Sequence, residues 1–357
     1  LDSSLSDAAL DDGATTPVGV GARSGGSFTL SSGALVVDDQ ITAVDSSAMA
    51  VAGTLSLNAS VVLTGVAKTL DLTAQSLAMA QGTALQTNNG AMRIEADNTV
   101  AGSGNLTLET VNAGTAALAL VADGAISDLD DASLITASAL WLDAAAGIGA
   151  SGTNPLNISV DTLALNNTAG SVFVSEVDAL SIGAVSVVTG QTTGGEDVKT
   201  AGNGALVLQT GGALSLTAST GELTATGTGH VLLSSGGALT VNAAINADSG
   251  AVSLLSVGAM DFGNDGDVSA TAGVDAEAGV GASTTAALTM HAGALIDSGN
   301  AAVRLSADGA LAVGAITAGS GDVSLISGAA ITDAALDTNA NVTGGLVRIV
   351  AVGAVGA

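Results

Sequence analysis

The sequence predicts an all-β protein folded as a parallel β-helix, a β-solenoid with about three short strands in each turn of 20–25 residues. Apolar and polar residues alternate with period two, which indicates strands. Gly, Asn, Asp and Ser interrupt each run after three to five residues, as turns would. The same apolar couplets return at a nearly constant spacing, and we expect right-handed winding.

The repeated element is an apolar-x-apolar couplet, followed after Gly-Ala by a second couplet. Couplets of this kind occur at Gly26–Val37, Gly204–Leu216, Gly229–Val241, Gly250–Phe262, Ala301–Val313 and Gly321–Ile331. First couplets begin at Leu206, Val231 and Val252, 25 and 21 residues apart, and again at Val303, Val323 and Val347, 20 and 24 residues apart. Each turn therefore places its couplets above those of the turn before.

The alternation assigns residues to the inside or the outside of the coil. Leu214, Leu216, Leu239 and Val241 are predicted to point inward, and the Gly beside each couplet allows a tight corner. Arg93, Arg304 and Arg348 each lie between two inward residues and are predicted to point outward. Trp141 aligns with Arg348 in a longer repeat, so we expect its side chain to be exposed.

The longer repeat is slightly over 200 residues. Gly104–Asp128 aligns without a gap with Gly309–Asp333 at an offset of 205. We therefore predict one continuous solenoid over residues 1–357, with about 1.7 copies of a unit of about 205 residues, near 1–203 and 204–357. Loop insertions are expected near 189–203 and 263–283.

Composition excludes several classes of function. The chain has six Lys and Arg against 33 Asp and Glu, a net charge of −27. Nucleic acids and anionic membranes are therefore not expected as partners, because both require clustered cations. Aromatic residues make up 1% of the chain, which disfavours a membrane barrel with aromatic girdles. Cysteine is absent, so disulfides and thiolate metal sites are not possible.

Three motifs carry a resemblance to a known family: Gly124–Asp128 (GAISD), Gly147–Ala150 (GIGA) and Pro155–Leu165 (PLNISVDTLAL). In this order they resemble giant secreted bacterial β-solenoid surface proteins, the filamentous-haemagglutinin-like repetitive exoproteins and adhesins. The resemblance implies export across a Gram-negative envelope and display at the cell surface.

No catalytic residue and no cofactor is predicted. His230 and His291 are 61 residues apart and are interpreted as turn residues that face solvent. Paired acids such as Asp11–Asp12 are interpreted as turn caps. Calcium is the one ion whose ligands are plentiful, and the candidates for binding it are Asp261, Asp265, Asp267, Asp128, Asp130 and Asp131.

These observations predict a structural and adhesive segment of a giant extracellular fibre, acting as a rigid acidic spacer. Its partners would be other copies or segments of the same chain, and a cell, host or abiotic surface. One alternative is a self-assembling sheath or surface-layer component, and a second is a carbohydrate-active β-helix enzyme. Both ends fit the internal repeat, so the native polypeptide is expected to continue beyond Leu1 and Ala357.

Overall fold

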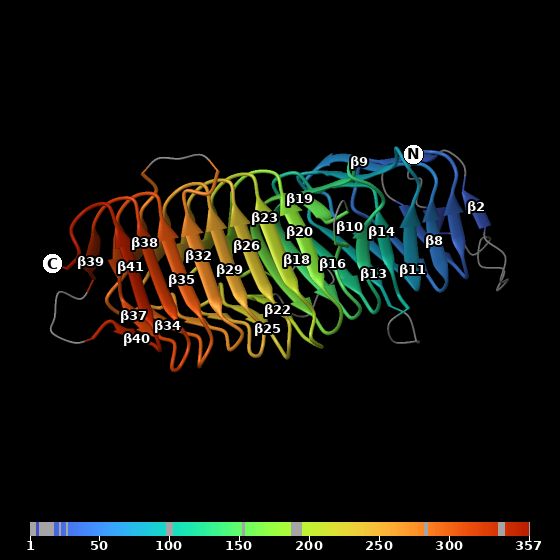
Figure 1. The fold of residues 1–357 in the computed structure, drawn as a ribbon. Coiled ribbons are helices and arrows are strands. Elements are labelled where there is room, and N and C mark those ends of the chain that lie inside the picture. Colours follow the sequence, from blue (N-terminus) through green and yellow to red (C-terminus); the bar gives the residue numbers. More distant parts are fainter. Residues whose placement is uncertain are drawn as a thin grey trace. The chain divides into compact units, whose positions relative to one another are not determined.

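A computed structural model describes residues 5–6, 18–20, 23–25, 28–97, 103–151, 154–186, 195–281, 285–334 and 340–356, with side chains from residue 33 onward. These residues form parallel strands and no helix, and they wind into a β-solenoid of about 13 turns (Figure 1). The predicted fold class is therefore confirmed. Nothing among the described residues is a helix long and apolar enough to cross a membrane.

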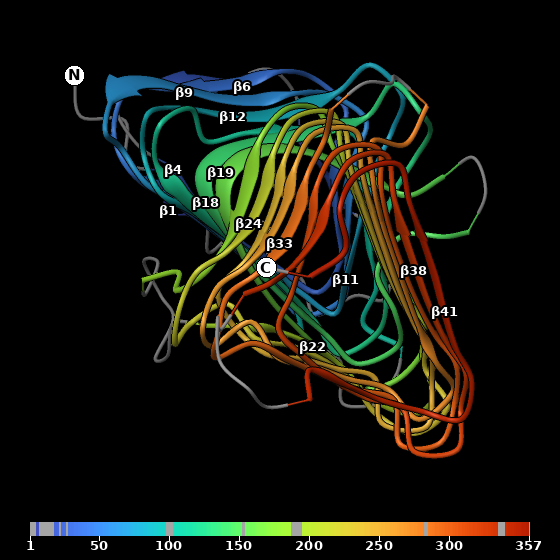
Figure 2. The same ribbon diagram turned by 60° about the vertical axis from the view of Figure 1, so that its left-hand side comes forward.

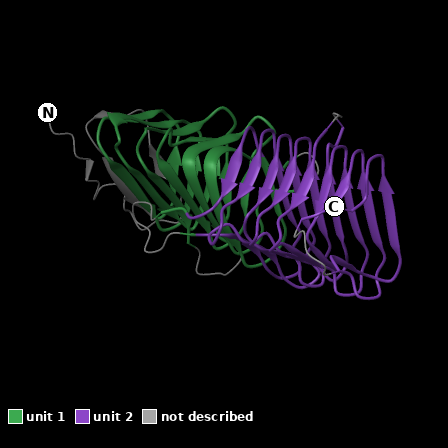
Figure 3. Cartoon of the chain, turned by 90° about the vertical axis from the view of Figure 1, so that its left-hand side faces the viewer, with its two compact units in different colours: residues 1–175, 185–195 green, residues 176–184, 196–357 purple. Residues whose placement is uncertain are grey.

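The chain divides into two compact units (Figure 3). Unit 1 comprises Leu1–Ser175 and Val185–Gly195, and unit 2 comprises Glu176–Ala184 and Glu196–Ala357. In each unit a strand pairs in parallel with the equivalent strand of the previous turn and of the next. Three ladders of strands therefore run through each unit.

The strands of unit 1 share this parallel stacking. Its first ladder contains β1 (Leu5–Ser6), β4 (Phe28–Ser32), β7 (Ser47–Val51), β10 (Leu70–Ala74), β13 (Met92–Ala96), β16 (Ala117–Ala122), and the second halves of β18 (Leu134–Ala144) and β19 (Leu156–Asn167). The second contains β2 (Val18–Val20), β5 (Leu35–Val37), β8 (Thr54–Leu57), β11 (Ser76–Met79), β14 (Leu106–Leu108) and β17 (Ile126–Asp128). The third contains β3 (Arg23–Gly25), β6 (Ile41–Ala43), β9 (Val61–Val66), β12 (Ala84–Asn88), β15 (Thr110–Asn112), and the first halves of β18 and β19. Strand β20 (Val172–Glu176) follows in sequence.

The ladders of unit 2 are more regular, and they lie on three sides of its coil, as β24, β38 and β22 show in Figure 2. The first contains β23 (Leu206–Thr210), β26 (Val231–Ser235), β29 (Val252–Ser256), β32 (Val274–Ala278), β35 (Val303–Ala307), β38 (Val323–Ser327) and β41 (Val347–Ala351). The second contains β21 (Leu180–Ile182), β24 (Leu214–Leu216), β27 (Leu239–Val241), β30 (Met260–Phe262), β33 (Leu288–Met290), β36 (Leu311–Val313) and β39 (Ile331–Asp333). The third contains β22 (Val198–Thr200), β25 (Leu223–Ala225), β28 (Ile245–Asn246), β31 (Val268–Ser269), β34 (Leu295–Asp297), β37 (Ala315–Thr317) and β40 (Val342–Thr343).

The core of each unit is a set of stacked aliphatic side chains. Leu214 stacks on Leu239 and Leu216 on Val241, and all four side chains are fully buried, as predicted. Close packing of aliphatic side chains at the same position of successive turns excludes water from the core. Polar residues alternate with them on the outer face, so one sequence period fixes both the core and the surface.

The corner glycines are explained by the close approach of successive turns. A Cβ on Gly236 would lie 2.3 Å from the carbonyl oxygen of Gly211, one turn earlier. Ser235, just before this corner, is buried and donates its hydroxyl hydrogen to the carbonyl of Gly212 or Ala238. The repeated Gly-Gly-Ala-Leu therefore combines a sterically required glycine with a buried couplet.

The predicted loop near 263–283 is wrong for its described part. Residues 268–269 and 274–278 are β31 and β32, each paired with a strand on both sides. They supply the turn between the couplets at Val252 and Val303. It was missed because the second inward residue of β32 is Ala276, fully buried but too small to mark an apolar couplet.

The other predicted loop, near 189–203, is wrong at Val198–Thr200, which is strand β22 and pairs with β25. Residues 189–194 lie outside the described residues.

The 205-residue offset of the long repeat is also present in the strand bounds. Strands β14, β15 and β17 correspond residue for residue to β36, β37 and β39.

Candidate ligand-binding groove

A groove of about 600 Å³ lies on the outer surface of unit 2. It crosses five successive turns, where strands β29, β32, β35, β38 and β41 begin. Its lining residues are Ala251, Val252, Ser253, Ala272, Gly273, Val274, Asp275, Ala302, Val303, Arg304, Asp322, Val323, Ser324, Leu346 and Arg348.

The apolar surface of the groove comes from Ala272, Ala302 and Leu346, which are exposed, because the valines at the strand starts point into the coil. Val252, Val274 and Val303 are the first residues of their strands and are 1–3% exposed. Before β29, β32 and β35 the preceding residues are small, Ala251, Gly273 and Ala302, so no large side chain fills the space above these three corners. The hollow follows directly from these small residues.

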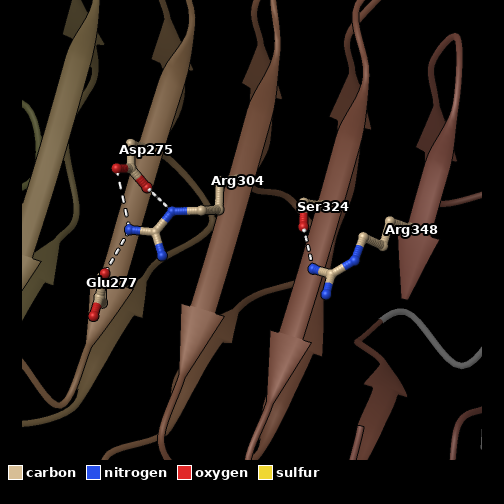
Figure 4. Close-up of polar contacts among 5 residues, drawn as sticks. All are labelled: Asp275, Glu277, Arg304, Ser324 and Arg348. Atoms are coloured by element: carbon tan, nitrogen blue, oxygen red, sulfur yellow. Dashed lines mark hydrogen bonds and ion pairs between the residues drawn. The ribbon is translucent and has the colours of Figure 1, made fainter. Parts of the chain in front are cut away.

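One wall of the groove is a row of outward side chains in register. Asp275 pairs with Arg304, Arg304 with Ser324, and Ser324 with Arg348, each one strand further along the ladder. Adjacent members are separated by the inter-strand spacing of about 4.8 Å. Both arginine side chains extend toward the preceding strand (Figure 4).

Arg304 is held by two carboxylates of the preceding turn. Its Nε donates to Asp275 Oδ1 at 2.7 Å and one terminal nitrogen to Asp275 Oδ2 at 3.2 Å. The same terminal nitrogen also donates to Glu277. The hydrogen bond to Asp275 raises the pKa of Arg304 against the opposing effect of burial. Its charge is therefore compensated within the protein.

Arg348 differs from the other Lys and Arg residues whose side chains the structure describes. Lys68, Arg93, Lys199 and Arg304 each form an ion pair with Asp or Glu. Arg348 is exposed, and the contact recorded for its guanidinium is a long hydrogen bond of 3.4 Å to Ser324 Oγ. No carboxylate lies within ion-pair distance of it in the described part of the chain, although acids outnumber bases more than fivefold.

The acidic residues predicted to bind calcium are not brought together. Asp261 contacts His291 Nε2 at 3.2 Å, and Asp267 Oδ1 accepts a hydrogen bond from the Leu295 amide at 2.9 Å. Asp265 is exposed. Within the described ranges no three His, Asp or Glu side chains gather as a metal site requires.

The second acidic trio does not form a metal-binding group among the described residues either. Asp130 Oδ1 accepts a hydrogen bond from the Ala132 amide at 2.9 Å, the turn-capping role expected for it, and Asp131 is exposed. Asp128 points inward and is 3% exposed. Its Oδ2 accepts hydrogen bonds from the amide and side chain of Asn157, while Oδ1 is buried without a partner among the described residues. Calcium binding by either trio stays a prediction from composition, and Asp11–Asp12 lie outside the described residues.

Both histidines are exposed, as expected. His230 Nδ1 accepts a hydrogen bond from the Ala251 amide, one turn further on, at 2.9 Å. His291 belongs to the pair with Asp261. Each therefore makes a local contact at a corner of unit 2.

The prediction that Trp141 is exposed is wrong. Its side chain points away from the coil of unit 1 but is only 9% exposed, because it packs with Ala119, Ala164 and Val185. Val185 and Gly195 pair in antiparallel fashion, and a Cβ on Gly195 would lie 2.0 Å from the indole ring. A distant segment thus covers an outward residue, and the local alternation carries no signal of that cover.

The groove itself was not predicted from the sequence. The sequence predicts a loop where β32 lies, so it does not place these five turns side by side. The available signal was the small residue before each couplet together with the register of Arg304 and Arg348. No protein-family model, curated protein or solved structure matches this chain.

Proposed function

We propose that this chain is a structural and adhesive segment of a giant extracellular fibre or surface protein, in which it acts as a rigid acidic spacer. The proposal includes display at the surface of a Gram-negative-type bacterium, in keeping with the exoproteins and adhesins that the sequence resembles. Its partners would be other copies or segments of the same chain and a cell, host or abiotic surface. The observation that supports a spacer is the unbroken pairing of each ladder with the next turn within unit 2.

This pairing makes stability a sum over neighbouring turns. Each turn buries its aliphatic residues against the turns before and after it, so length can be added without a new core. The distance spanned then rises by about 4.8 Å for every added turn. A spacer needs this proportionality, whereas a globular domain lacks it.

The acidic surface supports a spacer over the sheath alternative. With a net charge of −27, copies lying side by side repel each other unless cations screen them. A sheath would need lateral contacts that outweigh this repulsion. Side-by-side association at physiological salt is the observation that would favour a sheath.

The carbohydrate-active alternative requires a groove with clustered Asp and Arg, and unit 2 has one. However, Asp275 is bound to Arg304, and Asp322 Oδ1 accepts a hydrogen bond from the Leu346 amide at 3.1 Å. Both carboxylates are therefore engaged in fixed contacts, which suits binding better than proton transfer. Release of reducing ends from a polysaccharide, lost in Asp322→Asn, would favour the enzyme instead.

The spacer is tested by deleting one whole turn. Removing residues 231–251 joins His230 to Val252 and leaves all three ladders able to pair, since Val231 and Val252 are register partners. Spin labels are placed at Gln209→Cys and Val350→Cys, in a chain that has no cysteine of its own. These positions lie in one outward row, six turns apart, or about 29 Å.

We expect the folded deletion variant to shorten the label distance by about 5 Å. The control removes residues 231–241, half a turn, and should lose cooperative folding because the ladders can no longer pair in register. Unfolding of the whole-turn variant, or an unchanged distance, would contradict the spacer.

A further inference from the structure

We propose that the groove of unit 2 binds a linear aliphatic molecule with an anionic head group. The aliphatic chain would lie along the groove, across the turns, and the head group would contact Arg348 and Ser324. The proposal is independent of the spacer function, because it depends on the residues that line the groove, whereas the spacer depends on the repeated pairing of turns.

The shape of the groove favours a long, narrow ligand. It crosses five turns, and four inter-strand intervals give a length of about 19 Å. Its exposed apolar side chains are those of Ala272, Ala302 and Leu346, and no aromatic ring lines it. An aliphatic chain gains affinity from burial against such a surface, whereas a flat ring has no partner on which to stack.

The backbone amides at the strand starts of the groove are already paired. In β29, β32, β35 and β38 the amide of the first valine donates to a carbonyl of the next turn. The pairs are Val252 to Gly273, Val274 to Ala302, Val303 to Asp322 and Val323 to Leu346. An extended peptide in the groove would bring its own amides and carbonyls, and its carbonyls would find no free amide at these strand starts. A hydrocarbon chain carries no such groups, so it fits where a peptide does not.

The position of Arg348 favours an anionic head group at one end of the groove. Arg304 is compensated by Asp275 and Glu277, and Asp322 is turned toward the Leu346 amide. Among the described residues, the contact of the Arg348 guanidinium is with a hydroxyl, that of Ser324. In a chain of net charge −27 this is a local position where an anion gains a charge-assisted hydrogen bond.

The test is a titration with alkyl carboxylates of increasing length, kept below the concentration at which they form micelles and followed by calorimetry. Each added methylene should raise the affinity about fourfold until the groove is filled. Alkylammonium ions of equal length serve as the opposite-charge probe. Non-specific attraction to the acidic surface would favour the ammonium series, whereas the groove predicts tighter binding of the carboxylates.

Three variants locate the site. Arg348→Gln should weaken carboxylate binding by about tenfold or more, since a charge-assisted hydrogen bond is lost. Ala302→Trp should abolish binding by filling the groove, because Ala302 is exposed in its middle. Lys68→Gln removes an equal charge in unit 1 and should leave binding unchanged; circular dichroism and thermal unfolding confirm that each variant is folded.

Two further probes, free alkyl carboxylate and phosphatidylglycerol vesicles, distinguish a soluble amphiphile from a membrane lipid as the ligand. Binding of free alkyl carboxylate without binding to phosphatidylglycerol vesicles indicates a soluble amphiphile, and binding to both indicates that the groove also takes a lipid chain. Either result supports the proposal. Equal affinity for alkylammonium ions, no dependence on chain length, tighter binding of an aliphatic peptide, or full affinity in Arg348→Gln would overturn it, and none of these outcomes bears on the turn-deletion test.

Discussion

Single residues in this fold differ in importance according to the face they occupy. An inward residue contacts the same position of two neighbouring turns, so its replacement affects three turns at once. An outward residue contacts solvent, unless another part of the chain covers it. Leu239 and Trp141 illustrate the two cases.

Leu239→Asp should destabilise unit 2 by several kcal/mol. Leu239 is fully buried between Leu214 and Met260, and an aspartate there would be a buried charge without a partner. Ser215→Asp, on the outward side of the neighbouring strand β24 between Ser181 and Thr240, is the control and should cost less than about 1 kcal/mol. Chemical denaturation of both variants measures the difference, and equal losses would refute the inward and outward assignment.

Trp141→Ala should cost about 3 kcal/mol, a core-like loss for an outward residue, because the indole fills the space under Val185 and Gly195. Since Trp141 is the only tryptophan of the chain, its fluorescence reports on this cover directly. We expect blue-shifted emission that quenchers reach poorly in the native protein. Emission typical of exposed tryptophan would contradict the packing.

Asp128 should make stability depend on pH. Burial raises the pKa of Asp128 above its ordinary value, against the hydrogen bonds from Asn157, and the charge of Asp131 raises it further. The pKa of Asp128 is higher in the folded protein than in the unfolded chain. Its contribution to the free energy of unfolding is therefore complete below about pH 4 and is lost as the pH rises through the folded-state pKa.

Asp128→Asn removes this titration while keeping the shape of the side chain. The variant should gain stability relative to the native protein between about pH 4 and neutrality. Urea denaturation across that range measures the gap between the two proteins. A gap that does not change with pH would show that Asp128 keeps an ordinary pKa.

Strands are held in register by more than their couplets. In both units an arginine binds the aspartate that is its register partner one turn earlier: Arg93 binds Asp71, and Arg304 binds Asp275. A glutamate completes each cluster: Glu95 lies two residues after Arg93 on the same strand, and Glu277 lies two residues after Asp275 on the preceding strand. Because successive turns are so alike, such outward pairs distinguish the correct partner strand from its neighbours.

The arginines of the two clusters differ in burial, so replacing each by alanine should cost a different amount of stability. The side chain of Arg93 is 14% exposed and that of Arg304 is 37% exposed. Arg93→Ala should therefore be the more destabilising and the less sensitive to salt, while Arg304→Ala should cost about 0–1 kcal/mol and less at high salt. Denaturation of both variants at two salt concentrations checks the order, and the reverse order would contradict it.

For the whole molecule, charge is the dominant long-range term. The chain has 33 acids and six bases, so compact folding brings like charges together on the surface. Stability should rise with salt from low ionic strength to about 0.15 M, where charges separated by more than about 8 Å are screened. Thermal unfolding in sodium chloride measures this, and stability that falls with salt would indicate that attractive pairs dominate instead.

The sequence alone determined the solenoid, the three strands in each turn and the inward residues such as Leu239 and Val241. These features depend on contacts between neighbouring turns, and alternation with a fixed repeat encodes them directly. The sequence signal is weak at β32, because Ala276 occupies an inward position where other turns have a larger residue, and the prediction of a loop there is wrong. The tertiary structure alone decided the burial of Trp141, the surroundings of the six aspartates and the groove beside Arg348. Each of these depends on which side chains meet across turns or under a distant segment, and a repeating local pattern carries no information about such meetings.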